Sequence, residues 1–271
     1  VVRYGLLLAL MAFTLLPVLW MFVSSLKPEA DIWEAVPRWI PRQATLENYV
    51  WAFGPYSANI VPLLRNSLIT SAVTALMTAA FAATSGYILG KFTFPGKKAF
   101  AVLVILSQLF QGPILMTPWY RLAMNWGLVN TRLALILIYG TVTIPIGVWL
   151  MSGFMNAIPD ELEEAARMDG ATDLQVVTRI VLPLAKPSVV VTALMVLIYV
   201  WNEYIYATTF MTGEQNYTLA AGLYALQATE TSGSWPVFAA ASIAVSLPVL
   251  IIFFLCQKHM TSGLTAGGVK G

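Results

Sequence analysis

Charged side chains are scarce in this chain. Lys, Arg, Asp and Glu together make up 10% of its 271 residues, whereas soluble globular proteins carry about 25%. This deficit excludes an ordinary water-soluble fold, and the 58% hydrophobic content indicates an integral membrane protein. The formal net charge of +2 offers no indication of a nucleic-acid partner, and we expect none.

Cysteine and histidine are each present only once. Because a disulfide needs two cysteines, the single Cys256 excludes a disulfide framework within the chain. Protein zinc sites combine several His, Cys or carboxylate ligands, so the single His259 argues against a histidine-based metal site. We therefore expect no metal and no cofactor on this chain.

The chain also lacks the groups that an ATPase or another enzyme would need. Gly90 and Gly96 precede Lys97, but the glycines are one residue further apart than in a phosphate-binding loop, and no Ser or Thr follows the lysine. We find no convincing pair of a nucleophile and a base. The sequence predicts a protein that is not an enzyme.

Long apolar stretches are what the chain has in abundance. Five of them contain no charged residue, and a sixth is interrupted only by Glu203. A helix needs about 20 apolar residues to cross a bilayer. We therefore predict an all-α integral membrane protein with six transmembrane helices in a single domain, and we expect the first to be a true span rather than a signal peptide. The expected spans are residues 4–26, 66–90, 99–120, 133–157, 187–211 and 235–257.

The basic residues suggest an orientation. The connection Lys91–Lys98 has three lysines and no acid, whereas Gly213–Trp235 has two acids and no base. Lys and Arg collect on the cytoplasmic side of membrane proteins, so both termini are expected in the cytoplasm. The segment 158–186, which we call the surface hairpin, and the tail 258–271 are then cytoplasmic too.

Local signals predict two helices in the surface hairpin. Pro159 fits the first turn of a helix, and the acidic residues after it suit the positive helix end. Gly170 is expected to end this helix in a left-handed conformation. Thr172 and Gln175 have the spacing of a capping box, which predicts a second helix up to Leu182–Pro183.

The first helix of the hairpin has a face of small residues. Leu162, Ala165, Ala166 and Asp169 share this face, and alanine side chains let another surface come close. We interpret it as a docking face for a cytoplasmic partner. The alternative is a hairpin that lies on lipid, which the acidic first turn disfavours because anionic headgroups would repel it.

The fifth predicted span has a polar face. Tyr199, Asn202, Glu203 and Tyr206 follow helical spacing, which would align them on one side. A carboxylate within a span usually faces the bundle interior or a water-filled path. One interpretation is a path for a sugar, which needs hydrogen bonds and flat rings for stacking. The other is a structural cluster that joins helices.

Two weaker patterns predict local structure elsewhere. Gly86 and Gly90 form a small-x-x-x-small pattern, which lets helix backbones approach closely. We interpret this pattern as a site of helix packing. A short helix is expected from Thr45 to about Phe53, because Thr45 suits the N-cap and Gly54 the end.

One pattern in the surface hairpin is specific enough to suggest a family. It fixes seven positions in 20 residues and resembles the EAA motif of permease subunits of binding-protein-dependent ABC importers. Trp201–Tyr204 resembles a signature of the sugar-importing branch, and Gly263–Gly271 resembles the tail of the second permease of maltose-type importers. The motif positions are Glu164, Ala165, Ala166, Gly170, Ile180, Leu182 and Pro183.

The resemblance implies a type I ABC importer permease fold in a bacterial or archaeal cytoplasmic membrane. It implies four kinds of partner: a homologous second permease, two ATPase subunits that hold ATP and Mg²⁺, an extracytoplasmic binding protein, and a sugar. The motif residues, with Asp169, would couple this chain to an ATPase subunit. The tail, at Gly267, Gly268 and Lys270, would contact the ATPases as in maltose-type relatives.

A secondary sugar transporter or facilitator is the alternative. Such a protein would share the polar span but would not need a cytoplasmic docking segment. Co-purification with an ATPase subunit would distinguish the two. Which sugar is carried, and whether this subunit touches it, stay open.

Overall fold

The computed structural model describes residues 2–34, 36–54, 59–110, 112–228 and 234–268, and their regular structure is entirely helical. The long helices are α1 (Val2–Ser25), α4 (Ile60–Lys91), α7 (Arg132–Ala157), α10 (Leu182–Asn202) and α13 (Trp235–Gly268). The shorter helices are α2 (Glu29–Ile32), α3 (Glu47–Phe53), α5 (Lys97–Leu106), α6 (Pro113–Asn125), α8 (Asp160–Met168), α9 (Asp173–Val176), α11 (Ile205–Phe210) and α12 (Leu219–Ala228).

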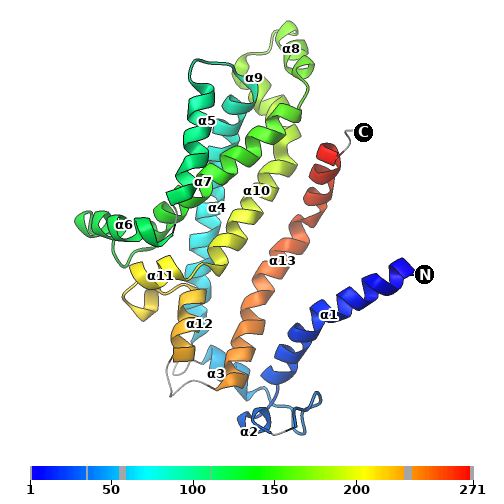
Figure 1. Ribbon diagram of the computed structural model, residues 1–271, viewed down its shortest axis with the longest axis vertical. Helices are drawn as coiled ribbons and strands as arrows, with labels where there is room; N and C mark the ends of the chain where they lie inside the picture. The colour runs from blue at the N-terminus through cyan, green and yellow to red at the C-terminus, as the bar shows by residue number, and fades with distance from the viewer. Residues whose placement is uncertain (1, 35, 55–58, 111, 229–233, 269–271) are drawn as a thin grey trace.

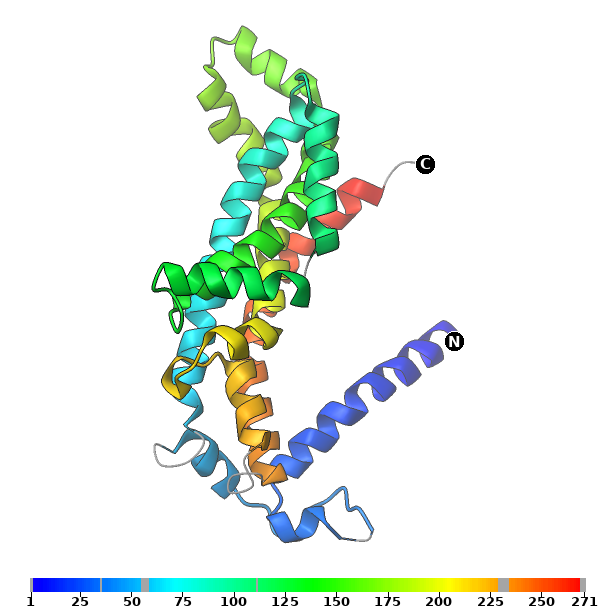
Figure 2. The same ribbon diagram turned by 60° about the vertical axis from the view of Figure 1, so that its left-hand side comes forward.

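The helices form an elongated bundle. α4, α7 and α10 run side by side, with α13 next to α10, while α1 begins away from the bundle and meets α13 with its own C-terminal end (Figures 1 and 2). α8 and α9 lie at one end, and α2 and α3 lie at the other. Within the described residues, five helices are long and apolar enough to cross a membrane, and the bent pair of α5 and α6 makes a sixth if it counts as one span. The all-α, six-span prediction is therefore confirmed.

The third predicted span, residues 99–120, is wrong as a single straight helix. α5 continues into a 3₁₀ turn at Ser107–Phe110, and α6 then leaves at 94° to it (Figure 2). Gly112 has φ +82°, a conformation that favours glycine, and Pro113 occupies the first turn of α6. Neither residue changes the apolar composition of the stretch, so composition alone could not reveal the bend.

The fifth predicted span, residues 187–211, also differs at both ends. The second hairpin helix does not stop at Leu182–Pro183, because α9, a π-helical turn at Val177–Val181 and α10 form one unbroken helical run. Pro183 therefore lies inside this run, just after the π-helical turn, where the regular hydrogen-bond ladder of the helix is interrupted. At the other end α10 stops at Asn202, so the prediction of a single helix through Glu203 is wrong.

The remaining predictions of local structure are close to the structure. α3 begins at Glu47 and ends before Gly54, but its N-cap is Leu46 and not Thr45 as expected; the Thr45 hydroxyl still accepts a hydrogen bond from the Glu47 N–H at 3.1 Å. α13 runs to Gly268, so the tail predicted from residue 258 begins as a continuation of the last span. The Gly213–Trp235 connection contains α12.

Glycines bring α4 and α7 into backbone contact. A Cβ atom at Gly86 would lie 2.6 Å from Cβ of Met151, and one at Gly90 would lie 2.6 Å from Cβ of Met155. Both distances are shorter than carbon atoms can tolerate, so glycine is required at both positions. The small-x-x-x-small pattern thus marks close packing between α4 and α7.

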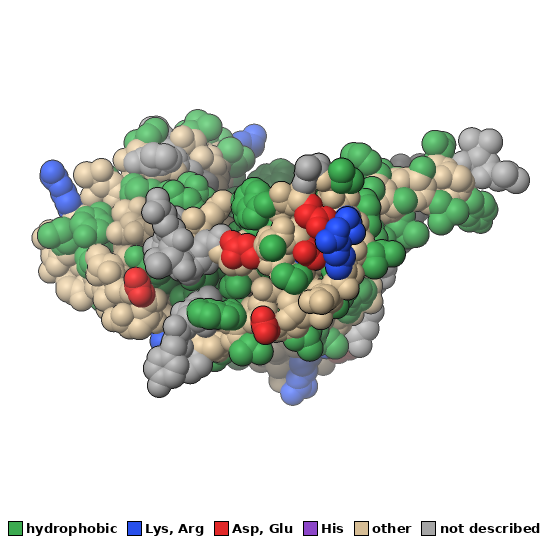
Figure 3. Space-filling model, turned by 90° about the horizontal axis from the view of Figure 1, so that it is seen from below, with side chains coloured by type: hydrophobic (Ala, Val, Ile, Leu, Met, Phe, Trp, Pro, Cys, Tyr) green, Lys and Arg blue, Asp and Glu red, His purple; other side chains and the backbone are tan. Residues whose placement is uncertain are grey.

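The end of the molecule formed by α2 and α3 carries charges of both signs. Seen from this end, acidic and basic side chains form small groups among hydrophobic and polar surface (Figure 3). Glu34 pairs with Arg38 at 2.9 Å and with Arg42 at 3.6 Å. Lys27 is buried under this region, where its ammonium lies 4.4 Å from the centroid of the Trp20 ring and donates to the Arg38 carbonyl.

Candidate functional site

The surface hairpin folds as its local signals predict. α8 begins directly after Pro159 with three acidic residues in its first turn. Gly170 has φ +86°, and the N–H of Ala171 donates to the Ala166 carbonyl at 3.0 Å to close the turn. The Thr172 hydroxyl and the Gln175 side chain form both hydrogen bonds of a capping box at the start of α9. These elements fix α8 at the end of the bundle (Figure 1).

The motif residues divide between an exposed and a buried side of the hairpin. Glu164, Ala165, Asp169 and Gly170 are exposed. Ala166 is only 9% exposed and packs in a hydrophobic cluster with the ends of α4 and α7. Ala166 therefore holds α8 onto the bundle, and the shared docking face predicted for both alanines is wrong.

The second half of the motif lies beside the first. Ile180 is half-buried against the same hydrophobic cluster, and it belongs to the π-helical turn that leads into α10. Leu182 and Pro183 follow in the first turn of α10, and both are exposed. Ala166 and Ile180, from the two halves of the motif, thus pack in the same hydrophobic cluster, and the exposed Gly170 turn lies between them in the sequence.

A buried carboxylate that sequence reasoning missed anchors α8. Glu163 is 4% exposed, and its Oε2 accepts a hydrogen bond from the Tyr87 hydroxyl at 2.9 Å. Its Oε1 lies 3.5 Å from Nζ of Lys91, whose side chain is 7% exposed. Lys91 also pairs with Asp160 at 2.6 Å and donates to the Ile158 carbonyl. We call Tyr87, Lys91, Asp160 and Glu163 the α4–α8 clamp.

Arg167 extends this network along the surface. Its guanidinium lies 3.5 Å from Glu163 and donates to Asp173 at 3.1 Å, so it connects α8 with α9. The hydrogen bond to Asp173 raises the pKa of Arg167 above its ordinary value. This exposed pair contributes little stability by itself, because water screens it.

The polar residues at the end of α10 do not share one helical face. Glu203 follows the last residue of α10, and its carboxylate accepts hydrogen bonds from the Tyr139 hydroxyl at 2.7 Å and the Ile205 N–H at 2.8 Å. It also accepts from the N–H of Tyr206 at 3.0 Å. Glu203 thus joins α7 to the start of α11. This is the arrangement expected of a structural cluster that joins helices, the alternative to a sugar path.

The other three polar residues have different environments. Tyr206 is buried, and its hydroxyl accepts a hydrogen bond from the Gly112 N–H at 3.1 Å, where α6 begins. Tyr199 and Asn202 are exposed on the surface of this subunit. Only Tyr199 and Asn202 therefore present polar groups outward, while Glu203 and Tyr206 hold the helix ends in place.

Comparison with known proteins agrees with this architecture. Residues 83–264 match the family described as binding-protein-dependent transport system inner membrane component. The chain belongs to this family of transport permeases. In this family ATP is hydrolysed by separate ATPase subunits rather than by the permease.

Curated relatives match the permease over nearly its whole length. An inner membrane ABC transporter permease protein of Escherichia coli (strain K12), YcjP, is 35% identical over 95% of this chain and 92% of its own. The trehalose transport system permease protein SugB of Mycobacterium tuberculosis is 31% identical, over 96% and 93%. The trehalose/maltose transport system permease protein MalG of Thermococcus litoralis is 31% identical, over 95% and 92%.

A solved structure has the same fold. A chain of a bacterial ABC transporter that imports the acidic polysaccharide alginate aligns with a TM-score of 0.81, over 95% of this permease and 94% of that chain. Their sequence identity is 22%, so this match bears on the fold alone.

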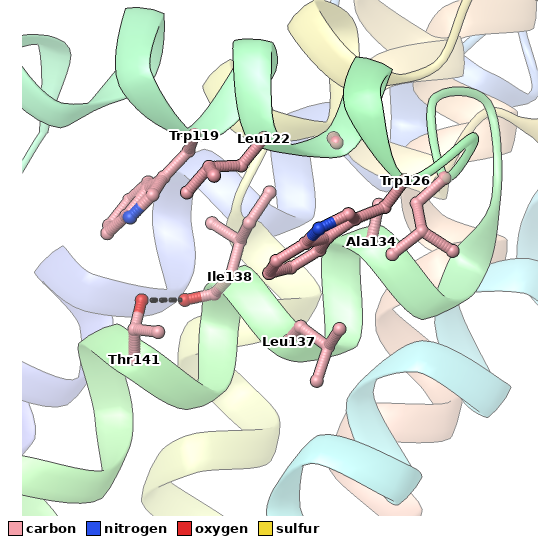
Figure 4. Close-up of a pocket in the computed structure, with 9 residues that line it drawn as sticks. Trp119, Leu122, Trp126, Ala134, Leu137, Ile138 and Thr141 are labelled. Carbon is pink, nitrogen blue, oxygen red and sulfur yellow. Dashed lines mark hydrogen bonds between the residues drawn. The ribbon is translucent and has the colours of Figure 1, made fainter.

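Two features of the described part of the permease bear on what it could bind: its potential metal-ligating side chains and a cavity beside α6. Within that part, no group of three or more His, Cys, Asp or Glu side chains is placed to hold a metal ion. A cavity of about 180 Å³ lies between α6 and α7, lined by residues such as Trp119, Trp126 and Ile138 (Figure 4). Its lining is almost entirely apolar, and the Thr141 hydroxyl donates to the Ile138 carbonyl at 2.7 Å. Such a lining suits apolar groups better than sugar hydroxyls.

At the opposite end from α8, Asn66 fixes the connection before α12. Its amide donates to the carbonyls of Gln215 at 2.9 Å and Tyr217 at 3.0 Å, and its Oδ1 accepts from Nε of Arg132 at 3.1 Å. Asn66 is 1% exposed, so these bonds are shielded from water. An asparagine at the start of α4 therefore joins three distant parts of the permease.

Proposed function

We propose that this permease forms part of an ATP-driven importer that carries a sugar or oligosaccharide into the cytoplasm. Family membership supports import coupled to a binding protein. Relatives named for trehalose, for trehalose and maltose, and for galactooligosaccharides match at least 94% of the chain. The proposal that the substrate is a sugar rests on these matches. An extracytoplasmic binding protein would deliver the sugar.

The exposed side of α8 is the proposed docking site for an ATPase subunit. Glu164, Ala165, Asp169 and Gly170 are accessible there, while Ala166 and Glu163 hold the opposite side on the bundle. A short helix held in this way can move with its partner rather than bend. When the ATPases close on ATP, α8 would follow, and the bundle would switch access from one side of the membrane to the other.

The orientation follows from the same proposal. The ATPases are cytoplasmic, so α8, the start of α1 and the end of α13 would face the cytoplasm of a bacterial or archaeal cell. The lysines at the α4–α5 connection support this side. The helical extension of α13 through Gly267 and Gly268 would then point toward the ATPases, with Lys270, which lies outside the described residues, beyond it.

A homologous second permease is the proposed partner within the membrane. Large apolar side chains of α1, such as Leu6, Leu10 and Phe13, are more than 60% exposed. Lipid and a second permease would both suit this helix. Exposed Tyr199 and Asn202 would line a path at the interface between the two permeases, and Glu203 and Tyr206 would position the helices around it.

Co-purification tests this proposal against the alternative of a facilitator. The permease would be expressed with candidate ATPase, second permease and binding-protein genes from its chromosomal neighbourhood and purified by a tag on the permease. A stoichiometric ATPase and ATP-dependent uptake of trehalose, maltose or a galactooligosaccharide into vesicles are expected. Sugar equilibration by the permease alone, without ATP, would favour the facilitator.

A further inference from the structure

The α4–α8 clamp connects the proposed docking helix to a helix far from it in the sequence. α8 is continuous in the chain with α7 and, through the Gly170 turn, with α9. The clamp adds a third connection, to the end of α4. We propose that it is the positioning device that makes α8, α4 and α7 move as one rigid body when the ATPases close. This inference rests on the proposed docking of α8.

Burial distinguishes the clamp from an ordinary surface ion pair. Glu163 and Lys91 have side chains that are 5% and 7% exposed, whereas exposed ion pairs are screened and contribute little. The shorter pair of Lys91, with Asp160 at 2.6 Å, is wetter because the Asp160 side chain is 78% exposed, and Oε1 of Glu163 contacts Lys91 at 3.5 Å without a hydrogen bond. Loss of Lys91 would leave the buried Glu163 carboxylate with the partly exposed Arg167, 3.5 Å away, as its nearby cation, so the native pairing is favoured over a broken one. The clamp therefore resists separation of α8 from α4.

The clamp holds α8 at two levels, which also resists rotation. Tyr87 and Lys91 are one turn apart on α4, and Asp160 and Glu163 are one turn apart on α8. Tyr87 bonds Glu163, while Lys91 bonds Asp160 and approaches Glu163. Because Lys91 also donates to the Ile158 carbonyl, it fixes the chain just before α8 as well.

Movement of α4 must then carry α7 with it. A Cβ at Gly86 or Gly90 would come within 2.6 Å of α7, so the two helices touch through backbone and cannot slide without clashes. The connection from α8 to α10 is different, because it passes through the Gly170 turn and the π-helical turn at 177–181. The rigid body therefore contains α4, α7 and α8, while α10, although it packs along α4, is joined to α8 through these two turns.

Spin-label distances within the assembled importer test this inference without knowledge of the sugar. Cys256 is the single cysteine, so Cys256→Ser gives a cysteine-free parent. Labels at Glu161→Cys on α8 and Leu76→Cys on α4 use exposed positions outside the clamp and outside the motif. The distance is measured without nucleotide and with ATP plus vanadate, and ATPase activity is measured on the same labelled complexes.

The inference expects one mean distance in both nucleotide states of the parent. Lys91→Met should shift or broaden the distance when ATP and vanadate are added, and Lys91→Arg should restore the parent behaviour. Coupling free energies typically correspond to about 5–150-fold effects, so binding-protein stimulation of ATPase activity should fall about tenfold in Lys91→Met. Lys98→Met removes an exposed lysine near the start of α5 and serves as the matched control.

Three results would overturn the inference. One is a parent distance that itself changes with ATP, because α8 and α4 would then not move together. Another is a Lys91→Met complex that behaves like Lys98→Met. If the Lys91→Met complex does not assemble, the near-isosteric Glu163→Gln variant takes its place. A distance between the labels that stays as in the parent in that variant would be the third result against the inference. Failure of the parent to bind an ATPase would instead refute the proposed function, and this inference with it.

Discussion

Replacing Gly170 with valine tests whether the left-handed turn after α8 is needed for coupling. Gly170 has φ +86°, and a Cβ atom there would meet nothing within 4 Å. The expected penalty is therefore a backbone penalty alone, without a steric clash against neighbours. A left-handed conformation costs an L-residue about 1–2 kcal/mol, and a β-branched residue tolerates it least.

This penalty is large on the scale of a local turn. A change of one or two kcal/mol alters an equilibrium by about 5–30-fold. The turn is closed by hydrogen bonds from Gly170 to Arg167 and from Ala171 to Ala166, each 3.0 Å long. Valine should open these bonds and reorient the exposed side of α8. The membrane helices lie away from this turn, so their stability should change little.

The assay compares three variants at the same position in the assembled importer. Stimulated ATPase activity should fall from Gly170→Asn to Gly170→Ala to Gly170→Val, because asparagine adopts the left-handed conformation most readily. The largest loss should be about 5–30-fold, with the thermal unfolding midpoint of the permease nearly unchanged. Full coupled activity in Gly170→Val would refute the reasoning, as would an equal loss in all three variants.

Further predictions concern the packing and the polar contacts of the bundle. Gly86→Ala should destabilise the permease by about 1–3 kcal/mol, because the added Cβ atom would clash with α7. Gly153→Ala is the control, since Gly153 has open space around it and its replacement should not destabilise the permease. Thermal unfolding in detergent compares the two variants, and equal unfolding midpoints would contradict the close contact at Gly86. Glu203→Gln should lower the free energy of unfolding by about 1.5–3 kcal/mol, since the charged acceptor for Tyr139 and the α11 N–H groups is lost. An unchanged unfolding midpoint would show that Glu203 does not hold these helices together. Asn66→Leu should speed hydrogen exchange in residues 213–218, and unchanged exchange would show that its bonds do not hold that segment.

The amino-acid sequence by itself determined the class of the protein and most of its elements. Apolar stretches long enough to cross a bilayer specify spans wherever they occur, because hydrophobicity is a property of each segment. The Gly170 turn and the Thr172–Gln175 capping box were also predictable, since both depend on residues within one turn of a helix. The motif in the surface hairpin named the family for the same reason: its residues lie close together in the sequence.

Tertiary structure alone decided what the polar residues touch. Glu163 looked like one of several acids in a first turn, and its partner Tyr87 is 76 positions away. Glu203 looked like part of a helical face, but it joins Tyr139 on α7 to the start of α11. A buried charge is stable only beside its partners, and those partners come from helices whose packing no local pattern encodes. The sequence therefore specified the helices, while their packing determined which carboxylates anchor them.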